Sequence, residues 1–240
     1  MLRNLTDYES AVLTGQTGTR GDQMALQIVV QAAQMLGADS LIEIHSSHID
    51  GCLYHGDSGV LFCEKLVDEG ARVKVPSTTN VGALNLLNPN QVHLPTKQRA
   101  MALRLMNAHD KLGCTPSWTC APYQAGARPD PGQQVAWGES NAVAFVNSVL
   151  GARSNRYGDF LDIACAIAAR APYYGLHRPE NRVAELLVDV SGLPTKLLRE
   201  DVFFAVIGSM VGHLAGETIC VIDGMPKEAR EDQLLSLIHI

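Results

Sequence analysis

The chain has 240 residues, 46% of them hydrophobic and 18% charged, which is enough apolar material for a folded core and is not typical of a disordered chain. Its 19 Lys and Arg residues against 25 Asp and Glu residues give a formal net charge of -6, without any run of basic residues. This balance excludes a broad nucleic-acid surface, which requires a basic stripe. No apolar stretch resembles a signal peptide or a membrane helix of about 18 residues, so we expect a cytoplasmic protein with no membrane partner.

Helical periods alternate with short β-rich runs along the chain. Helices are expected at 23–36, 58–68, 96–112, 139–150, 159–170 and 200–214, and a last one from about 226. Strands are expected at 40–45, 71–75, 185–190 and 217–222. In the first helix, Asp22 is the expected N-cap and Leu36 belongs to the expected core face. The alternation predicts an α/β fold with a largely parallel sheet, in which sites gather in the loops after strands.

The segment 46–56, SSHIDGCLYHG, follows the first expected strand and is dense in polar side chains. His48 and Asp50 are candidates for proton transfer, because a histidine titrates near neutrality. The other candidate site residues in this segment are Ser46, Ser47, Gly51, Cys52 and Tyr54. A polar turn that satisfies its own backbone is the alternative interpretation.

A second polar segment, 76–82 (PSTTNVG), follows the next expected strand. Its hydroxyl groups and the amide of Asn80 suit a carboxylate or phosphate oxygen. An ordinary turn that caps the next element is the alternative, and the segment taken alone slightly favours that alternative.

The segment 119–123, TCAPY, lies in an irregular stretch in which Pro122 keeps Cys120 out of a helix. A cysteine on such a loop is better placed to bind a metal than one on a helix face, and thiolate is the ligand of iron–sulfur clusters. One cysteine cannot hold a cluster, so the remaining ligands must come from elsewhere. Tyr123 is a further candidate for substrate binding, whereas Cys63 and Cys165 fall on apolar helix faces and are expected in the core.

The segment 137–156 contains the last group of candidate residues. Glu139, Ser140 and Asn141 lie at an expected helix start, where backbone N–H groups can hold an anion. After that helix, Arg153 and Arg156 could clamp a carboxylate or phosphate, with Asn155 between them. Helix capping followed by a solvated basic turn is an equally good interpretation.

These segments together resemble the aconitase X family, a branch of the aconitase superfamily. The resemblance runs in order from about residue 2 to residue 234, and its motifs are SSHIDGCLYHG (46–56), VPSTTNVGALNL (75–86), TCAPY (119–123), AWGESNAV (136–143), NSVLGARSNRYGD (147–159) and YYGLHRPENR (173–182). It implies aconitase-type α/β/α layers and a dehydratase, that is a hydro-lyase, which uses an iron–sulfur cluster as a Lewis acid. It also implies that Cys120 is a cluster ligand, with Cys52 the next candidate.

The family resemblance implies further parts that the 240 residues do not contain. A small swivel domain, fused or on a separate chain, closes over the cluster in this family and carries a serine base. A Gly-Cys-Pro-His type motif that should supply further cysteine ligands is absent, and residues 235–240 do not resemble the expected continuation. We therefore expect this chain to be the N-terminal part of the catalytic region, with two α/β lobes as one arrangement and their boundary near 113–135. We expect it to be inactive by itself.

The resemblance leaves the substrate open between two small acids. The His-Ile-Asp-Gly-Cys-Leu-Tyr form resembles the cis-3-hydroxy-L-proline dehydratases more than the mevalonate 5-phosphate dehydratases. On this hypothesis, His48 and Ser140 are catalytic and the remaining candidates bind substrate, with Asp50 or Glu139 accepting the ammonium group. A non-catalytic fragment that binds a small acid is the third alternative.

Overall fold

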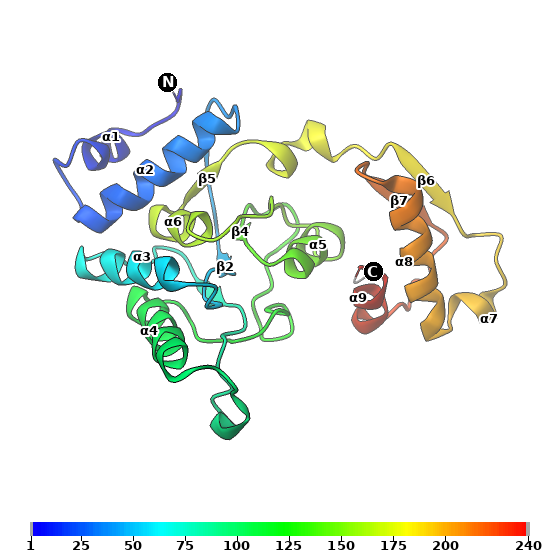
Figure 1. Ribbon diagram of the computed structural model, residues 1–240. Helices are drawn as coiled ribbons and strands as arrows, with labels where there is room; N and C mark the ends of the chain where they lie inside the picture. The colour runs from blue at the N-terminus through cyan, green and yellow to red at the C-terminus, as the bar shows by residue number, and fades with distance from the viewer. Residues whose placement is uncertain (1, 239–240) are drawn as a thin grey trace. The chain divides into compact units, whose positions relative to one another are not determined.

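The computed structural model describes residues 2–238 and divides into two compact units, residues 1–177 and 178–240 (Figure 1). The segment 113–135, at which the sequence suggested a boundary between lobes, lies inside the first unit. The unusual tail 235–240 falls partly outside the described residues, at 239 and 240.

The first unit contains six α-helices among the described residues, together with five short strands and two short 3₁₀ helices. In chain order the elements are α1 (Asp7–Leu13), α2 (Arg20–Met35), β1 (Leu41–Glu43), β2 (Ser47–Ile49), α3 (Asp57–Asp68), β3 (Ser77–Thr79), η1 (Pro89–Gln91), α4 (Thr96–Leu112), β4 (Ala136–Trp137), α5 (Ser140–Ser148), α6 (Leu161–Ala168), β5 (Arg170–Pro172) and η2 (Gly175–His177).

Three parallel strands form the sheet that carries the candidate site, in the order β3-β2-β4. Thr78 of β3 and Trp137 of β4 lie on either side of His48 in the central strand. Single parallel bridges extend this row to Thr115 beside Thr78 and to Arg156 beside Trp137. Strands β1 and β5 form a separate antiparallel pair. The predicted α/β fold with a largely parallel sheet is therefore confirmed.

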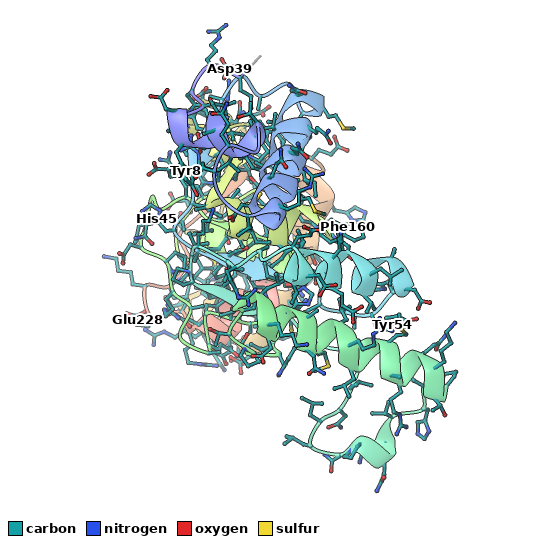
Figure 2. All side chains as sticks on the ribbon, turned by 90° about the vertical axis from the view of Figure 1, so that its left-hand side faces the viewer. Tyr8, Asp39, His45, Tyr54, Phe160 and Glu228 are labelled. Carbon is teal, nitrogen blue, oxygen red and sulfur yellow. The ribbon has the colours of Figure 1, made fainter. Side chains whose placement is uncertain are left out.

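Helices cover the three-stranded sheet on both sides. Helix α6 packs against β2, β4 and α2, and its sequence LDIACAIA is apolar apart from Asp162. Figure 1 shows α5 on the other side of β4 from α6. Helices α3 and α4 run side by side (Figures 1 and 2), and Figure 2 shows the segment between β3 and α4 extending away from both.

Two polar segments that were expected to be loops are strands. The first expected strand, 40–45, is only β1, and the chain continues into β2 within the SSHID motif. Residues 71–75 form no strand, because Val73 and Lys74 donate their backbone N–H groups to the carbonyls of Leu112 and Ala166, which lie in helices. The next strand is β3, in the PSTTNVG motif.

The start of α2 also differs from the expectation. Thr19, and not Asp22, is the N-cap, and Asp22 is the N3 residue of a reciprocal capping box with Thr19. The helix therefore begins three residues earlier than expected. Its buried face includes Leu26 and Val29, whereas Leu36 is exposed at the C-cap.

The second unit is a β-α-β arrangement. Strands β6 (Leu186–Asp189) and β7 (Cys220–Asp223) pair in parallel, and α8 (Asp201–Ala215) lies between them in the chain. The remaining elements are η3 (Pro179–Arg182), α7 (Thr195–Leu198) and α9 (Glu231–Ile238). Among residues 2–238, no helix combines the length and apolar character that crossing a bilayer requires.

Candidate active site at the carboxyl edge of the sheet

The candidate site lies where the three parallel strands end at the same edge of the sheet. Asp50 follows β2, Asn80 follows β3, and Glu139 comes two residues after Trp137 at the end of β4. Because parallel strands end together, three polar side chains from distant parts of the sequence share this edge.

Asp50 is held on two sides within this edge. Its Oδ1 accepts a hydrogen bond of 2.6 Å from Nδ2 of Asn80, which is buried. On the other side, Gly138 approaches so closely that a Cβ atom there would lie 2.8 Å from the Cβ of Asp50. The orientation of the Asp50 carboxylate is therefore fixed by residues after both neighbouring strands.

Glu139 caps helix α5 with its own side chain. Its Oε2 accepts a 2.7 Å hydrogen bond from the backbone N–H of Ala142, and its Oε1 accepts one of 3.1 Å from the hydroxyl of Ser140. The helix start that was predicted to hold an anion therefore already holds a carboxylate. Ser140 is exposed and Asn141 is half-buried.

Arg153 and Arg156 lie on a segment beside β4, at different positions along the direction of that strand. Arg153 forms a parallel bridge with Gln134, and Arg156 forms one with Trp137. Both segments advance by three residues between these bridges, so the backbones of the two arginines are about 10 Å apart if the chain is extended. Neither guanidinium has a hydrogen bond or ion pair within residues 2–238. This spacing does not support one clamp made by both arginines, and Arg156 is the nearer to the carboxyl edge.

The loop that carries Cys120 is attached to the carboxyl end of β3. Thr79 accepts hydrogen bonds from the hydroxyl of Ser117 (2.7 Å) and the backbone N–H of Thr119 (3.4 Å). Trp118 between them has a φ of 45°, in the left-handed region that non-glycine residues rarely adopt. Cys120 is exposed. An accessible thiol next to the end of β3 fits the role of a single metal ligand.

Cys52 has a different environment from Cys120. It is 1% exposed, and its thiol donates to the carbonyls of Asn80 (3.1 Å) and Ile49 (3.3 Å). Burial raises the pKa of this thiol well above its ordinary value, which disfavours the thiolate that metal binding requires. Cys52 therefore ties the turn between β2 and α3 to the residue after β3. Its thiol is buried and directed at backbone carbonyls, unlike the exposed thiol of Cys120.

The described residues do not form a complete metal site. Within residues 2–238 no group of three or more His, Cys, Asp and Glu side chains is arranged to hold a metal ion. The donor set therefore fits one ligand of an iron–sulfur cluster, Cys120, and does not fit a whole cluster.

His48 lies inside the sheet and not at its edge. The side chain has no exposed surface, and its Nδ1 lies 2.8 Å from the hydroxyl of Thr78 in the neighbouring strand. Burial lowers the pKa of His48 to about 4, so the ring is neutral at pH 7. The buried ring therefore does not reach the carboxyl edge, where its role in proton transfer was predicted. The Nε2 atom of His48 is buried without a hydrogen-bond partner among the described residues.

Three further predicted site residues have structural partners near β2. The hydroxyl of Ser47 is buried and donates to the carbonyl of Ala136 at 2.6 Å. Ser46 precedes β2, at the opposite end of the strand from Asp50, and lies 3.5 Å from Nε1 of Trp137. The hydroxyl of Tyr54 donates to Asp57 at 2.7 Å. The contacts of Ser46 and Ser47 are with β4, whereas Tyr54 ties the loop after β2 to the first residue of α3.

Two more predicted residues are used by the fold. The amide of Asn155 donates to the carbonyl of Tyr174 (3.0 Å) and accepts from the N–H of Leu176 (2.8 Å), so it holds the turn at 174–176. The ring of Tyr123 is 2% exposed and stacks on Phe145, with 3.8 Å between ring centroids.

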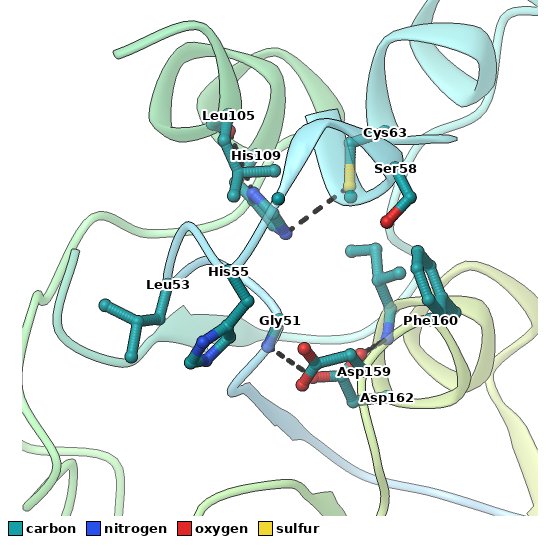
Figure 3. A pocket seen from close by; sticks show the side chains of 13 residues that line it. Gly51, Leu53, His55, Ser58, Cys63, Leu105, His109, Asp159, Phe160 and Asp162 are labelled. Carbon is teal, nitrogen blue, oxygen red and sulfur yellow. Dashed lines mark hydrogen bonds between the residues drawn. The ribbon is translucent and has the colours of Figure 1, made fainter. Parts of the chain in front are cut away.

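Asp162 is a residue that sequence analysis missed. Figure 3 shows its carboxylate accepting from the backbone N–H of Gly51, the residue after Asp50. Gly51 therefore contributes through its backbone. An acidic residue within the otherwise apolar LDIACAIA helix was the available signal, because a buried carboxylate requires compensating donors.

Comparisons with known proteins agree on one family. The family model described as "Aconitase X first domain" matches residues 3–180. The chain is 40% identical to a cis-3-hydroxy-L-proline dehydratase of Pseudomonas aeruginosa over 221 residues, which is 92% of this chain and 37% of that protein. It is 40% identical to a Hypocrea jecorina protein of the same name over 230 residues, 95% of this chain and 38% of the relative.

A second group of relatives carries another name. The chain is 34% identical to the phosphomevalonate dehydratase large subunit of Thermococcus kodakarensis over 229 residues, 95% of this chain and 56% of that subunit. The crystal structure of Thermococcus kodakaraensis aconitase X (holo-form) superposes with a TM-score of 0.81 and 32% identity, covering 98% of this chain and 58% of that one. The chain thus spans between 37% and 58% of the length of these relatives.

Proposed function

We propose that this chain, which belongs to the aconitase X family, is part of a hydro-lyase that removes water from cis-3-hydroxy-L-proline. The relatives with that name are dehydratases and are 40% identical to the chain, against 32% to 38% for five phosphomevalonate dehydratase large subunits. The feature that supports this choice most is the acidic character of the carboxyl edge, where Asp50 and Glu139 lie.

Asp50 is the proposed acceptor for the ring ammonium of the substrate. Asn80 occupies its Oδ1 and leaves Oδ2 without a partner among the described residues. A charge-assisted hydrogen bond to an ammonium is about twice as strong as a neutral one. Glu139 contributes a second negative charge at the same edge, although its oxygens already cap α5. This edge attracts a cation and repels a phosphate.

Arg156 is the proposed partner of the substrate carboxylate. Its exposed guanidinium has no ion pair within residues 2–238, and it lies beside β4 on the same sheet as Asp50. One cation and two carboxylates suit a zwitterion, whereas mevalonate 5-phosphate carries a phosphate as well as a carboxylate and would need more cations. Ser140 and Asn141 at the start of α5 remain proposed contacts for the single hydroxyl of the substrate.

We further propose an iron–sulfur cluster as the cofactor, with Cys120 as the ligand from this chain. Such a cluster, when bound, acts as a Lewis acid that weakens the bond to the departing hydroxyl. The chain's own residues would then bind the ammonium at Asp50, bind the carboxylate at Arg156 and set the orientation of the ring. A swivel domain, fused or separate, is the proposed partner that completes the site, and the cytoplasm is the proposed compartment.

The test is an assay of the full-length protein, purified without oxygen, on both substrates side by side. We expect a dehydrated product from cis-3-hydroxy-L-proline and none from mevalonate 5-phosphate. Asp50→Asn should raise KM by about tenfold or more, because it removes a charge-assisted contact. The matched control is Asp68→Asn, which neutralises an exposed carboxylate at the C-terminal end of α3. Turnover of only the phosphate ester would refute the proposed substrate, and binding of either acid without turnover would support the non-catalytic alternative.

A further inference from the structure

We propose that Asp162 is a positioning residue that holds Asp50 in the orientation required for the substrate ammonium; this rests on the function proposed above. Asp162 lies in the first turn of α6, beneath the turn that connects β2 to α3. It touches the backbone of that turn and not the substrate itself.

The carboxylate of Asp162 accepts three backbone N–H groups. Its Oδ2 accepts from Asp50 at 2.8 Å and from Gly51 at 3.0 Å, and its Oδ1 accepts from Ile163 at 2.6 Å. The residue has no exposed surface, and no Lys or Arg within residues 2–238 forms an ion pair with it. The hydrogen bonds to Asp50 and Gly51 therefore provide most of the stabilisation of this buried charge.

Burying a carboxylate is an energetically costly way to satisfy the N–H groups of a turn. Backbone carbonyls or a neutral hydroxyl or amide side chain satisfy turn N–H groups without burying a charge. A carboxylate adds two features, because it accepts two N–H groups on one oxygen and carries a negative charge behind the carboxyl edge. Both features act on Asp50.

Gly138 restrains the same turn from the other side. A Cβ atom at Gly138 would lie 2.8 Å from the Cβ of Asp50 and 3.2 Å from Oδ2 of Asp162. The Asp50 turn therefore lies between Asp162 and Gly138, while Asn80 orients its side chain. Three contacts from three different elements determine one carboxylate.

The groups near Asp162 come from several elements. Asp50 is on the turn, Asp159 precedes α6, and burial together with the charge of Asp162 raises the pKa of the thiols of Cys52, Cys63, Cys114 and Cys165. Asp159 and Asp162 line a cavity of about 100 Å³ with Gly51 (Figure 3). Two histidines, His55 after β2 and His109 on α4, line the same cavity, and burial lowers the pKa of His109. Burial raises the pKa of Asp162 to about 7. A proton on this carboxylate would place a donor against N–H donors and weaken the hold on Asp50.

The test compares Asp162→Asn with Asp159→Asn in the full-length protein. Asp159 is exposed and lines the same cavity, and it makes no hydrogen bond to the turn within residues 2–238, so it controls for the loss of a nearby charge. Hydrogen–deuterium exchange of the peptide that spans 46–54 reports on the turn and requires no substrate. We expect faster exchange in Asp162→Asn and wild-type exchange in Asp159→Asn.

Kinetics separate positioning from a merely structural role. We expect Asp162→Asn to raise KM by about tenfold with a smaller effect on kcat, since the ammonium contact is weakened. We expect kcat/KM of the wild type to fall as the pH drops below about 7, because Asp162 becomes protonated. This acidic limb should disappear in Asp162→Asn and persist in Asp159→Asn. Unchanged exchange at 46–54 would overturn the proposal. A fall in kcat as large as the rise in KM, with the acidic limb retained, would also overturn it.

A second variant covers the case in which Asp162→Asn does not fold. Gly138→Ala presses on Asp50 and leaves the charge of Asp162 in place, so it should also accelerate exchange at 46–54 and raise KM, while retaining the acidic limb. Wild-type exchange and KM in Gly138→Ala would count against the proposal. If the wild-type protein does not dehydrate cis-3-hydroxy-L-proline, the proposed function fails, and the exchange data still decide whether Asp162 holds the turn.

Discussion

The ionisation of Asp162 should make the stability of the chain depend on pH in a defined direction. Its pKa is about 7 in the folded chain, against the ordinary 3.8, because burial disfavours the charged form. Folding therefore favours the protonated carboxylate. The corresponding stability is present below pH 3.8 and is lost as pH rises through about 7.

The size of the effect follows from the difference between the two pKa values. A difference of roughly three units corresponds to about 4 kcal/mol in total, of which about 2.5 kcal/mol is lost between pH 5 and pH 8. Asp162→Asn cannot ionise. The free energy of unfolding of wild type minus that of the variant should therefore fall by about 2.5 kcal/mol between pH 5 and pH 8.

Urea unfolding followed by circular dichroism at the two pH values measures this difference. Asp159→Asn is the matched control, because Asp159 is an exposed carboxylate three residues away, and its difference from wild type should vary much less. A wild-type minus Asp162→Asn difference that is constant, or that increases with pH, would contradict the raised pKa of Asp162. That result would indicate that the three N–H donors fully compensate the charge.

Three other predictions test the roles of individual residues. Cys120→Ser should lower the iron content and activity of the full-length protein, whereas Cys52→Ser should keep its iron and lose about 1 kcal/mol of unfolding free energy, because its thiol only donates to carbonyls. Iron analysis and urea titration check both outcomes, and retained iron in Cys120→Ser would reject it as a ligand. Arg156→Ala should raise KM by about tenfold or more, while Arg153→Ala, at the height of Gln134, should change it by less than about twofold. Equal increases in KM for the two variants would instead support a clamp made by both arginines. Thr19→Ala should cost about 1 kcal/mol of unfolding free energy, since it removes the capping box of α2; a loss below about 0.3 kcal/mol in urea titration would contradict this.

Local patterns were sufficient to place the longer elements. The helix expected at 96–112 is α4 with the same bounds, and the strands expected at 185–190 and 217–222 contain β6 and most of β7. Such elements are readable because apolar residues recur at the helical or strand period over many residues. The α/β class follows from the same alternation.

The short strands of the site were not readable in this way. Strand β2 consists of Ser47, His48 and Ile49, and strand β3 of Ser77, Thr78 and Thr79, so both resemble polar loops. Their side chains are polar because they bond to neighbouring strands, as Ser47 does with Ala136 and His48 with Thr78. Those partners are 30 to 89 residues away in the chain.

The sequence by itself determined the fold class, the family resemblance and the segments that contain the site. Only the tertiary structure decided which residues of those segments lie at the carboxyl edge. Asp50, Asn80, Glu139 and Cys120 come to the edge or next to it, whereas His48 and Cys52 turn inward from the same motif. Motif spacing cannot make this distinction, because alternate residues of a strand face opposite sides and burial depends on distant elements such as α6.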